Sequence, residues 1–463
     1  MSGATTSGDV VVIGGGLAGI TAALRLADSG RSVTLYESRP RLGGMAFSFS
    51  RSGPAGRLSV DNGQHVFLRC CDAYRGLLDR LGVTGLTTLQ DRLDITVLRP
   101  DGRSARLRRH ANVPAPAHLS GALLRYPLLS PLDRLRATRA AVALRLLDPS
   151  DPALDRRTLG DFLREHGQNR ATIEALWGVL ATATLNVHPD EASLALAATV
   201  FRTGVLDHAP AGDVGHAVAP LGALHSDAAA TALAGAGVEV RTGYHVTDVS
   251  SDDIGVRVSV RHRSETSVAA ADAVVLAVPP RVAVAVAPQL ADTSAARIGN
   301  FRTSPIVNVH VIYDRRVTDL PFAAAVDSPI QWFFDRTESS GLAASRPGAQ
   351  YLAVTVSAAD DVIDVAGPQL RERFVAEFAR LLPRARRADV LDAFVTRERH
   401  ATFRQAAGTA ALRPGADSGV AGVYLAGAYT DTGWPDTMEG AVRSGTTAAA
   451  AVEHAGAGMV RSA

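Results

Sequence analysis

The residues most suited to chemistry near the start of this 463-residue chain are three glycines with the spacing G-x-G-x-x-G. Gly14, Gly16 and Gly19 directly follow the apolar run 10–13. The first glycine permits a tight turn, the second lets the backbone approach a pyrophosphate, and the third allows a helix to pack closely on a strand. A helix that begins here would also direct its free N–H groups at the phosphates. The pattern therefore predicts a dinucleotide-binding site.

An acidic residue completes this pattern. Glu37 lies 18 residues after Gly19, at the end of a second apolar run, 32–36. A carboxylate at this place accepts hydrogen bonds from ribose hydroxyls and disfavours a 2′-phosphate. Between the two runs, apolar residues recur at helical spacing until Gly30, which favours a helix closed by a glycine cap. Together these segments predict a strand–helix–strand unit.

The C-terminal part of the chain repeats this arrangement. An apolar run at 423–426 is followed by Gly427 and a turn, and a helix is expected over 438–454. Asp436 and Glu439 form a D-x-x-E sequence, so we expect a capping box with Asp436 as N-cap and Glu439 reaching back to it. The middle of the chain is expected to be mainly helical over 119–225 and to form strands at 238–240, 256–260, 273–278, 306–312 and 351–356.

Several segments resemble a known family. Residues 14–19, Glu37 and residues 41–44 are similar to the FAD-binding N-terminus of the amine oxidase and phytoene desaturase superfamily. Within it, the chain resembles the squalene-associated FAD-dependent desaturases, the hydroxysqualene dehydroxylases, over nearly its whole length. The segments that carry this closer resemblance are 61–65, 158–163, 184–186, 430–435 and 437–442.

The resemblance implies an α/β fold, with a Rossmann-like FAD-binding domain of the GR2 flavoprotein type and a discontinuous substrate domain of mixed sheet and helices. The FAD-binding domain is expected to comprise residues 1–70, 225–285 and 415–463. The substrate-binding domain is expected to comprise residues 71–224 and 286–414, with a helical part at 118–147 that could face a membrane.

The resemblance also implies which residues hold FAD. They are Gly14, Gly16, Leu17, Ala18, Gly19, Glu37, Ser38, Arg41, Gly43, Gly44, Met45, Val246, Gly427, Asp431, Thr437, Met438 and Glu439. Met45 stands where the superfamily usually has an arginine or lysine, and Ala428 stands where it usually has an acid. Each change removes a polar flavin contact, so we expect loose FAD binding, with Asp431 substituting for the missing acid.

In the resembled family the substrate is hydroxysqualene, an allylic alcohol whose hydroxyl is replaced by hydrogen. Loss of water would leave an allylic cation, which a hydride from reduced flavin would quench. Such a reaction needs a proton donor, a dry apolar pocket and aromatic faces near the cation. Asp61, His65 and Trp332 are the candidate catalytic residues, with structural hydrogen bonding or core packing as the alternative for each. Because side chains alternate along a strand, Trp332 would share a face with Phe334 and not with Phe333.

Composition excludes several other classes of protein. All 48 residues counted as Lys or Arg are arginine, so the chain has no lysine for a Schiff base, a P-loop or the flavin-side water common in amine oxidases. A net charge of +2 argues against nucleic-acid binding. No metal-ligand spacing surrounds the adjacent Cys70 and Cys71, which are expected to be buried free thiols of a reducing compartment.

Two features bear on location. No apolar stretch is long enough to cross a membrane, and residues 1–8 do not resemble a secretory signal, so a cytoplasmic protein is expected. From Arg99 to Arg139, however, nine arginines and only two acids are interleaved with leucines, for a local charge of +7. Such a stretch can lie on anionic lipid headgroups, or it can be a solvated helical face over an ordinary core.

Three functions remain open at this point. The leading one is an FAD-dependent oxidoreductase of squalene and hopanoid biosynthesis that converts hydroxysqualene to squalene. The second is a carotenoid or phytoene-type desaturase or isomerase, which would remove hydride instead of delivering it. The third is a prenyl-binding protein of the same fold without catalysis. In each case the expected partner is a small isoprenoid, and the oligomeric state is left open.

Overall fold

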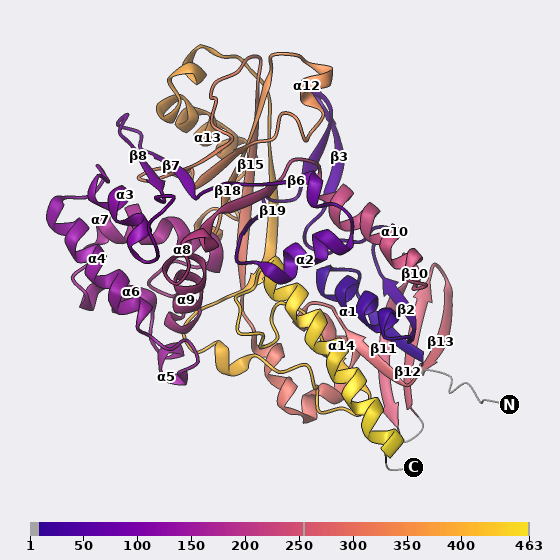
Figure 1. The fold of residues 1–463 in the computed structure, drawn as a ribbon. Helices are drawn as coiled ribbons and strands as arrows, with labels where there is room; N and C mark the ends of the chain where they lie inside the picture. The colour runs from indigo at the N-terminus through magenta and orange to yellow at the C-terminus, as the bar shows by residue number, and fades with distance from the viewer. Residues whose placement is uncertain (1–8, 253–254, 462–463) are drawn as a thin grey trace.

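The computed structural model of the chain describes residues 9–252 and 255–461 (Figure 1), so the expectation for residues 1–8 lies outside the described part. The predicted strand–helix–strand unit is confirmed as β1 (Asp9–Ile13), α1 (Leu17–Asp28) and β2 (Ser32–Glu37). α1 ends as expected, because Gly30 adopts a positive φ of 88° and its N–H donates to the Ala27 carbonyl.

A five-stranded parallel sheet is built around this unit. Its order is β10-β2-β1-β14-β20, with β10 (Glu239–Thr242), β14 (Ala273–Leu276) and β20 (Val423–Leu425). The strands come from three distant parts of the chain, which the sheet brings side by side. Their β1 and β14 runs are almost wholly apolar because helices and a second sheet cover both faces.

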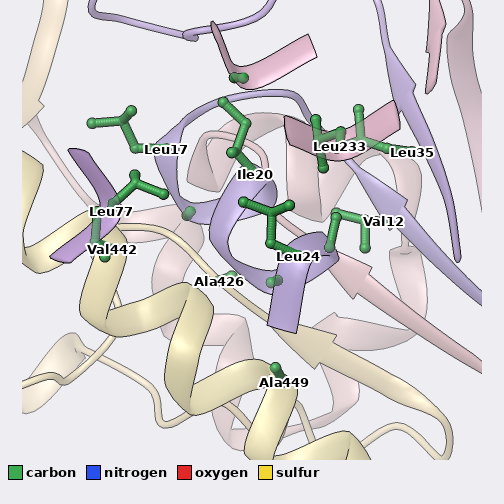
Figure 2. Packing of buried hydrophobic residues seen from close by; sticks show 14 of the residues in the cluster. Val12, Leu17, Ile20, Leu24, Leu35, Leu77, Leu233, Ala426, Val442 and Ala449 are labelled. Atoms are coloured by element: carbon green, nitrogen blue, oxygen red, sulfur yellow. The ribbon is translucent and has the colours of Figure 1, made fainter. Parts of the chain in front are cut away.

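One face of the parallel sheet is covered by helices. They are α1, α2 (Asp72–Arg80), α10 (Ala228–Gly235) and the long C-terminal α14 (Met438–Arg461). Figure 2 shows Ile20 and Leu24 of α1 in the same buried cluster as Val12 of β1 and as Val442 and Ala449 of α14. α1 and α14 approach so closely that a Cβ on Gly445 would lie 2.2 Å from the Ala18 carbonyl oxygen. The opposite face packs on a three-stranded antiparallel sheet, β11 (His245–Asp252), β12 (Gly255–His262) and β13 (Glu265–Ala271).

A second, seven-stranded sheet forms the other half of the molecule. Its order is β19 (Val390–Phe403), β15 (Thr303–Tyr313), β18 (Gln350–Val356), β17 (Trp332–Asp335), β16 (Phe322–Ala325), β7 (Asp94–Leu98) and β8 (Ser104–Arg108). Only the β16–β7 pair is parallel, so the sheet is mixed. α13 (Gly367–Leu381) packs on one face, with Phe374 and Phe378 in the core. A parallel nucleotide-type sheet joined to a mixed sheet confirms the predicted fold class.

The expected helical region lies at the side of this sheet (Figure 1). Its helices are α3 (Ser120–Leu124), α4 (Pro131–Arg145), α5 (Pro152–Asp155), α6 (Leu159–Glu165), α7 (Arg170–Thr172), α8 (Gly178–Leu185) and α9 (Leu194–Phe201). One strand within the region was not expected. β9 (Val214–Ala217) lies between β5 (Val66–Leu68) and β6 (Thr87–Leu89), and its V-G-H-A sequence is too short and too mixed to signal a strand by itself.

Shorter elements complete the fold. They are the hairpin β3 (Ser48–Gly53) and β4 (Gly56–Asp61), α11 (Pro280–Val286) and α12 (Leu342–Ser345). Cys70 and Cys71 are free, as expected, but only partly buried, because they lie in the segment directly before α2. Within the described ranges, no helix is both long and apolar enough to cross a membrane.

Candidate functional site

The glycine loop between β1 and α1 has no room for side chains. Gly14 has a φ of +107°, and a Cβ on it would lie 2.3 Å from the Ala277 carbonyl oxygen. A Cβ on Gly19 would lie 1.9 Å from the Gly14 carbonyl oxygen, so α1 can begin this close to β1 only with glycine there. The first and third glycines therefore have the packing roles that the motif predicts.

A second glycine pair lies directly against this loop. Gly43 and Gly44 have φ values of +92° and +56°, and the Gly43 N–H donates to the Gly15 carbonyl at 2.8 Å. A Cβ on Gly44 would lie 2.8 Å from the Gly16 Cα, whereas a Cβ on Gly16 itself would meet nothing nearer than Gly44. The two segments thus present bare backbone next to the N-terminus of α1, which suits a bound pyrophosphate.

Glu37 lies at the end of β2, as expected, and its side chain is fixed beside the loop. One carboxylate oxygen accepts from the Gly15 N–H and the other from the Arg39 N–H, both at 2.7 Å, and the Ser38 hydroxyl donates to the second at 3.2 Å. A carboxylate has about four lone-pair sites, so acceptor capacity is left for ribose hydroxyls. The Tyr244 N–H donates to the Glu37 carbonyl and leads into β11, where Val246 lies half-buried.

Arg41 and Met45 flank the paired glycines. The Arg41 guanidinium donates to the Leu42 and Gly44 carbonyls, at 3.2 and 3.0 Å, and lies over the Phe47 ring. It therefore stabilises the loop that carries Gly43 and Gly44. The Met45 side chain is 44% exposed, and its carbonyl accepts from the Asn62 amide at 2.8 Å.

The C-terminal motif returns to the same end of the parallel sheet. Gly427 follows β20 with a φ of +144°, and its N–H donates to the Ser444 hydroxyl of α14 at 2.8 Å. The following loop is held by a buried arginine that the sequence did not single out, Arg413, which donates to the carbonyls of Ala428, Tyr429 and Thr430. Asp431 is exposed and accepts from the Gly433 N–H in its own turn.

The prediction of a capping box at the start of α14 is wrong. Thr437, not Asp436, caps the helix, since its hydroxyl accepts from the Gly440 N–H at 3.2 Å. The Asp436 carboxylate accepts instead from the Phe403 N–H at 2.9 Å, and burial raises the pKa of Asp436 to about 6. Met438 and Glu439 begin the helix, so their N–H groups have no acceptor inside it and are available to a cofactor.

Glu439 reaches a different helix. Its two carboxylate oxygens accept from the Ala73 N–H at 3.2 Å and the Tyr74 N–H at 2.7 Å, which are first-turn donors of α2. It also pairs with Arg443 at 2.7 Å, and its side chain is fully buried. The D-x-x-E pattern was misleading because α2 packs on the start of α14 and presents unpaired N–H groups to the carboxylate.

A buried ion pair lies between the two halves of the molecule. Asp61, at the end of β4, accepts from the Arg336 guanidinium at 2.5 Å, the Ser48 hydroxyl at 2.6 Å and the Leu221 N–H at 3.0 Å. Arg336 also donates to the Ala217 carbonyl of β9 at 2.9 Å. Asp61 therefore joins the end of β4 to β3, to the segment after β9 and to the residue directly after β17. A direct catalytic role for its carboxylate stays a prediction.

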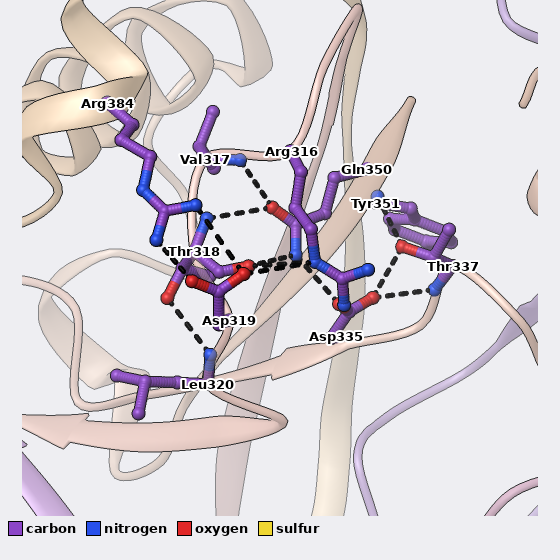
Figure 3. Close-up of polar contacts among 10 residues, drawn as sticks. All are labelled: Arg316, Val317, Thr318, Asp319, Leu320, Asp335, Thr337, Gln350, Tyr351 and Arg384. Atoms are coloured by element: carbon purple, nitrogen blue, oxygen red, sulfur yellow. Dashed lines mark hydrogen bonds and ion pairs between the residues drawn. The ribbon is translucent and has the colours of Figure 1, made fainter. Parts of the chain in front are cut away.

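A polar network lies at the end of β17 and includes Asp335 and Thr337, the neighbours of Arg336 in the sequence (Figure 3). Asp335 accepts from the Gln350 amide at 2.7 Å and from the Thr337 N–H at 2.9 Å. Gln350 in turn accepts from the N–H groups of Val317 and Thr318, at 2.7 and 3.0 Å. These bonds fix the chain on both sides of Arg336 and so direct its side chain towards Asp61.

Two imidazoles lie near this ion pair. Burial and, secondarily, the Arg336 charge lower the pKa of His65 to about 4, and the same two causes lower the pKa of His216 to about 4. Both rings are therefore neutral at pH 7. His216 lies on β9 opposite Val66, the first residue of β5, and His65 directly precedes that strand. His65 as a proton donor stays a prediction.

Two buried polar atoms of this region have no hydrogen-bond partner in the described chain. They are the Gln64 amide nitrogen and the His216 Nδ1. Leaving such a group unpaired costs about 1–3 kcal/mol, so an unpaired buried atom points to a ligand that would satisfy it. In the sequence, Gln64 lies within the segment 61–65 and His216 is isolated, so no local pattern marks either residue as part of a site.

The aromatic residues of β16 and β17 form a wall beside His216. Trp332 and Phe334 lie on one face, with rings 18° apart and centroids at 6.3 Å, and Phe322 lies beside both. The His216 ring meets Phe322 edge-on at 5.7 Å. Phe333 points the other way into the core under α13, which confirms the expected alternation. The Trp332 indole N–H donates to the Val179 carbonyl of α8 at 3.2 Å.

Comparison with known proteins agrees with this geometry. Residues 17–453 match the family model described as flavin containing amine oxidoreductase. The chain belongs to this family. Its cofactor is FAD, and the bare glycine backbone, the Glu37 carboxylate and the start of α14 fit that group. The role of each predicted FAD residue stays a prediction.

Similar proteins in this family act on different compounds. The chain is 30% identical to a hydroxysqualene dehydroxylase of Rhodopseudomonas palustris, over 96% of this chain and 99% of the relative. It is 25% identical to a zeta-carotene desaturase of Arabidopsis thaliana, over 96% of this chain and 85% of the relative. Among solved structures, a redesigned putrescine oxidase matches with a TM-score of 0.73 at 18% identity, covering 97% of this chain and 99% of the other. A cyclohexylamine oxidase from Brevibacterium oxydans matches with a TM-score of 0.69 at 20% identity, covering 97% and 99%. These two structural matches support the α/β flavoprotein fold.

Proposed function

We propose that this FAD-dependent oxidoreductase converts hydroxysqualene to squalene, the hydrocarbon in which hydrogen has replaced the hydroxyl. The observation that carries the proposal is the pair of unpartnered buried atoms on Gln64, in the segment before β5, and on His216, whose ring on β9 meets Phe322 of the aromatic wall. A pure hydrocarbon would leave both atoms unpaired, whereas a hydroxyl can accept from the Gln64 amide and can pair with an imidazole nitrogen such as the His216 Nδ1. Relatives named hydroxysqualene dehydroxylase that cover nearly the whole chain support the same assignment.

The chemistry requires two electrons and two protons, because an alcohol is reduced to a hydrocarbon and water. Bound FAD in its reduced form would supply the hydride. In the proposal Gln64 and His216 orient the hydroxyl, and the faces of Phe322, Trp332 and Phe334 stabilise positive charge on the allylic carbons. These residues also exclude water from a cation that water would trap.

His65 is the proton donor in this proposal. With a pKa near 4, its imidazolium is a strong acid that is rarely populated at pH 7. Protonation of the leaving hydroxyl should therefore become faster as pH falls from 7 towards 4. Burial, and secondarily the Arg336 guanidinium that pairs with Asp61, lowers the pKa of His65 and so keeps its ring neutral between turnovers.

A second candidate is desaturation of a polyene. Zeta-carotene desaturases match 96% of this chain at 25% identity, and the aromatic wall suits a carotene as well as a squalene skeleton. In that reaction the substrate loses hydride to oxidised FAD. The two unpaired atoms would then have no function.

Product analysis separates these candidates. Purified protein is loaded with FAD, reduced anaerobically with dithionite and incubated with hydroxysqualene; in parallel, oxidised protein is incubated with zeta-carotene. Squalene in the first arm supports the proposal, desaturated carotene in the second alone contradicts it, and neither product with retained isoprenoid favours a binding protein.

Two variants test the assigned residues. Gln64→Leu and His216→Phe should each lower kcat/KM for hydroxysqualene about tenfold or more, because the hydroxyl loses a buried partner. Gln289→Leu is the matched control, since its carbonyl oxygen is also buried without a partner in the described chain but lies outside the region of Arg336 and Trp332. Equal loss in all three variants would contradict the assignment.

A further inference from the structure

Large apolar side chains on the protein surface are concentrated in one short segment. Of the exposed large apolar residues in the described chain, those between 120 and 147 are Leu124, Leu132, Leu135, Val142 and Leu146. Leu124 is 66% exposed, Leu135 68% and Leu146 80%. Single exposed leucines are ordinary, but a group of this size on adjoining elements marks an interaction surface.

Helix α4 in this segment has most of its large apolar side chains on the solvent-facing side, which is the reverse of the usual arrangement. Its buried face is formed by Ala137, Ala140 and Leu144. Leu132, Leu135, Val142 and Leu146 recur at intervals of three, seven and four residues, so they form a stripe on the face that points to solvent. A helix that only covered a core would place these larger residues inward and the alanines outward.

Positive charge accompanies the stripe. Arg125 and Arg139 are exposed and form no ion pair with another described residue, and Arg139 falls within the stripe, seven residues after Leu132. Arg136 lies 3.6 Å from Asp133, whereas Arg134 donates to the Leu124 and Leu129 carbonyls and closes the α3–α4 turn.

The charged surface is smaller than the arginine count from 99 to 139 indicates. The first five arginines of that stretch form ion pairs with Asp94, Asp101, Asp213 and Asp327, three of which lie outside it. The exposed arginines without an ion pair in the described part of this stretch, Arg125 and Arg139, therefore lie in the α3–α4 segment together with the exposed leucines.

The segment also connects to the aromatic wall. Leu123, Tyr126 and Leu128, in and after α3, pack in the same apolar cluster as Trp332 and Phe334. The Tyr126 hydroxyl donates to the Ala175 carbonyl at 2.8 Å and fixes this turn to the rest of the domain. The exposed face is thus the outer side of a continuous apolar layer that ends at the proposed substrate wall.

We propose that residues 120–147 form a docking face for a lipid bilayer with anionic headgroups. The leucine stripe enters the boundary of the acyl chains, and Arg125 and Arg139 meet the lipid phosphates. An anionic bilayer is the occupant that complements both the stripe and the unpaired arginines. Docking does not depend on which isoprenoid reacts, so it can fail or succeed separately from the proposed function.

Vesicle flotation of the FAD-loaded protein tests the docking face. Binding is measured with phosphatidylcholine vesicles, with and without phosphatidylglycerol, at low and high salt. We expect binding to the anionic vesicles that weakens with salt. No binding to either vesicle at low salt would overturn the proposal.

Variants separate the leucines from the arginines. Leu135→Gln with Leu146→Gln should lower the partition coefficient about tenfold or more, whereas Val268→Gln, at 62% exposure on β13, should leave it unchanged. Arg125→Ala with Arg139→Ala should lower binding to anionic vesicles about tenfold or more, and Arg281→Ala on α11 is the matched control.

Equal effects of test and control variants would overturn the docking face. Analytical sedimentation without lipid tests the alternative that a second copy of the chain covers the docking face. A concentration-dependent dimer that Leu135→Gln dissociates would replace the membrane by a self-interface and contradict the proposal. All six substituted residues are exposed, and retained FAD absorbance with unchanged circular dichroism confirms that the variants fold.

Discussion

Glu439 allows a specific prediction, because its carboxylate binds another helix, α2, which the sequence around it does not indicate. Its carboxylate is fully buried and accepts from two backbone donors of α2, at Ala73 and Tyr74, while pairing with Arg443. Glu439→Ala removes both acceptors and leaves two buried N–H groups unpaired. Glu439→Gln keeps one acceptor oxygen and directs an amide N–H₂ group at the other donor.

The magnitudes follow from the number and kind of bonds lost. A hydrogen bond to a charged group contributes about 1.5–3 kcal/mol, so loss of both should lower the free energy of unfolding by about 3–5 kcal/mol. Glu439→Gln should cost about 2 kcal/mol, because one bond survives without its charge. Glu453→Gln is the control in the same helix, since its pair with Arg31 at 3.0 Å lies at the surface and contributes at most about 1 kcal/mol.

Two measurements check this prediction in the FAD-loaded protein. Urea unfolding gives the order of the midpoints, with Glu453→Gln near the parent, Glu439→Gln lower and Glu439→Ala lowest. Hydrogen exchange shows where the structure is loosened, and it should accelerate in the first turn of α2. Exchange that accelerates only in the first turn of α14 would indicate that Glu439 caps its own helix, and would refute the reasoning. A urea midpoint of Glu439→Ala equal to that of the control would refute it as well.

Three further predictions concern the FAD site and pH. Gly44→Ala should weaken FAD binding about tenfold or more in a fluorescence titration, because its Cβ would contact Gly16, whereas Gly82→Ala, with φ +71° and open space, should not. Ala428→Asp should tighten FAD about tenfold, since it restores a charged acceptor at the start of α14; an unchanged Kd would contradict the expected loss of a polar contact there. Burial lowers the pKa of His310 to about 3, so its contribution to stability is complete above pH 6.5 and is lost as pH falls from 6.5 towards 3. His310→Gln should reduce the slope of unfolding free energy against pH by about 1.4 kcal/mol per pH unit between pH 6 and 4, and an unchanged slope would count against a neutral buried ring.

Features determined by neighbouring residues could be predicted from the sequence. The β1–α1–β2 unit, its glycine cap and the end position of Glu37 depend on spacing within about thirty residues. The alternation of Trp332, Phe333 and Phe334 also follows from strand geometry alone. Each of these features appears in the structure where it was expected.

Features determined by contacts between distant residues could not be predicted from the sequence. Glu439 meets Tyr74, which is 365 residues away, and Arg336 meets Asp61, which is 275 residues away. A D-x-x-E pattern has the same appearance whether its acid caps its own helix or another one. β9 has no strand pattern of its own and forms only because two other strands flank it.

The direction of hydride transfer is the central claim of this account. Its most direct test is a single-turnover experiment in which anaerobically reduced, FAD-loaded protein is mixed with one equivalent of hydroxysqualene. The absorbance of oxidised flavin is followed, and lipids are extracted at the end point. The account predicts that flavin is reoxidised and that one squalene forms per flavin. Flavin that stays reduced while hydroxysqualene is recovered unchanged would contradict it.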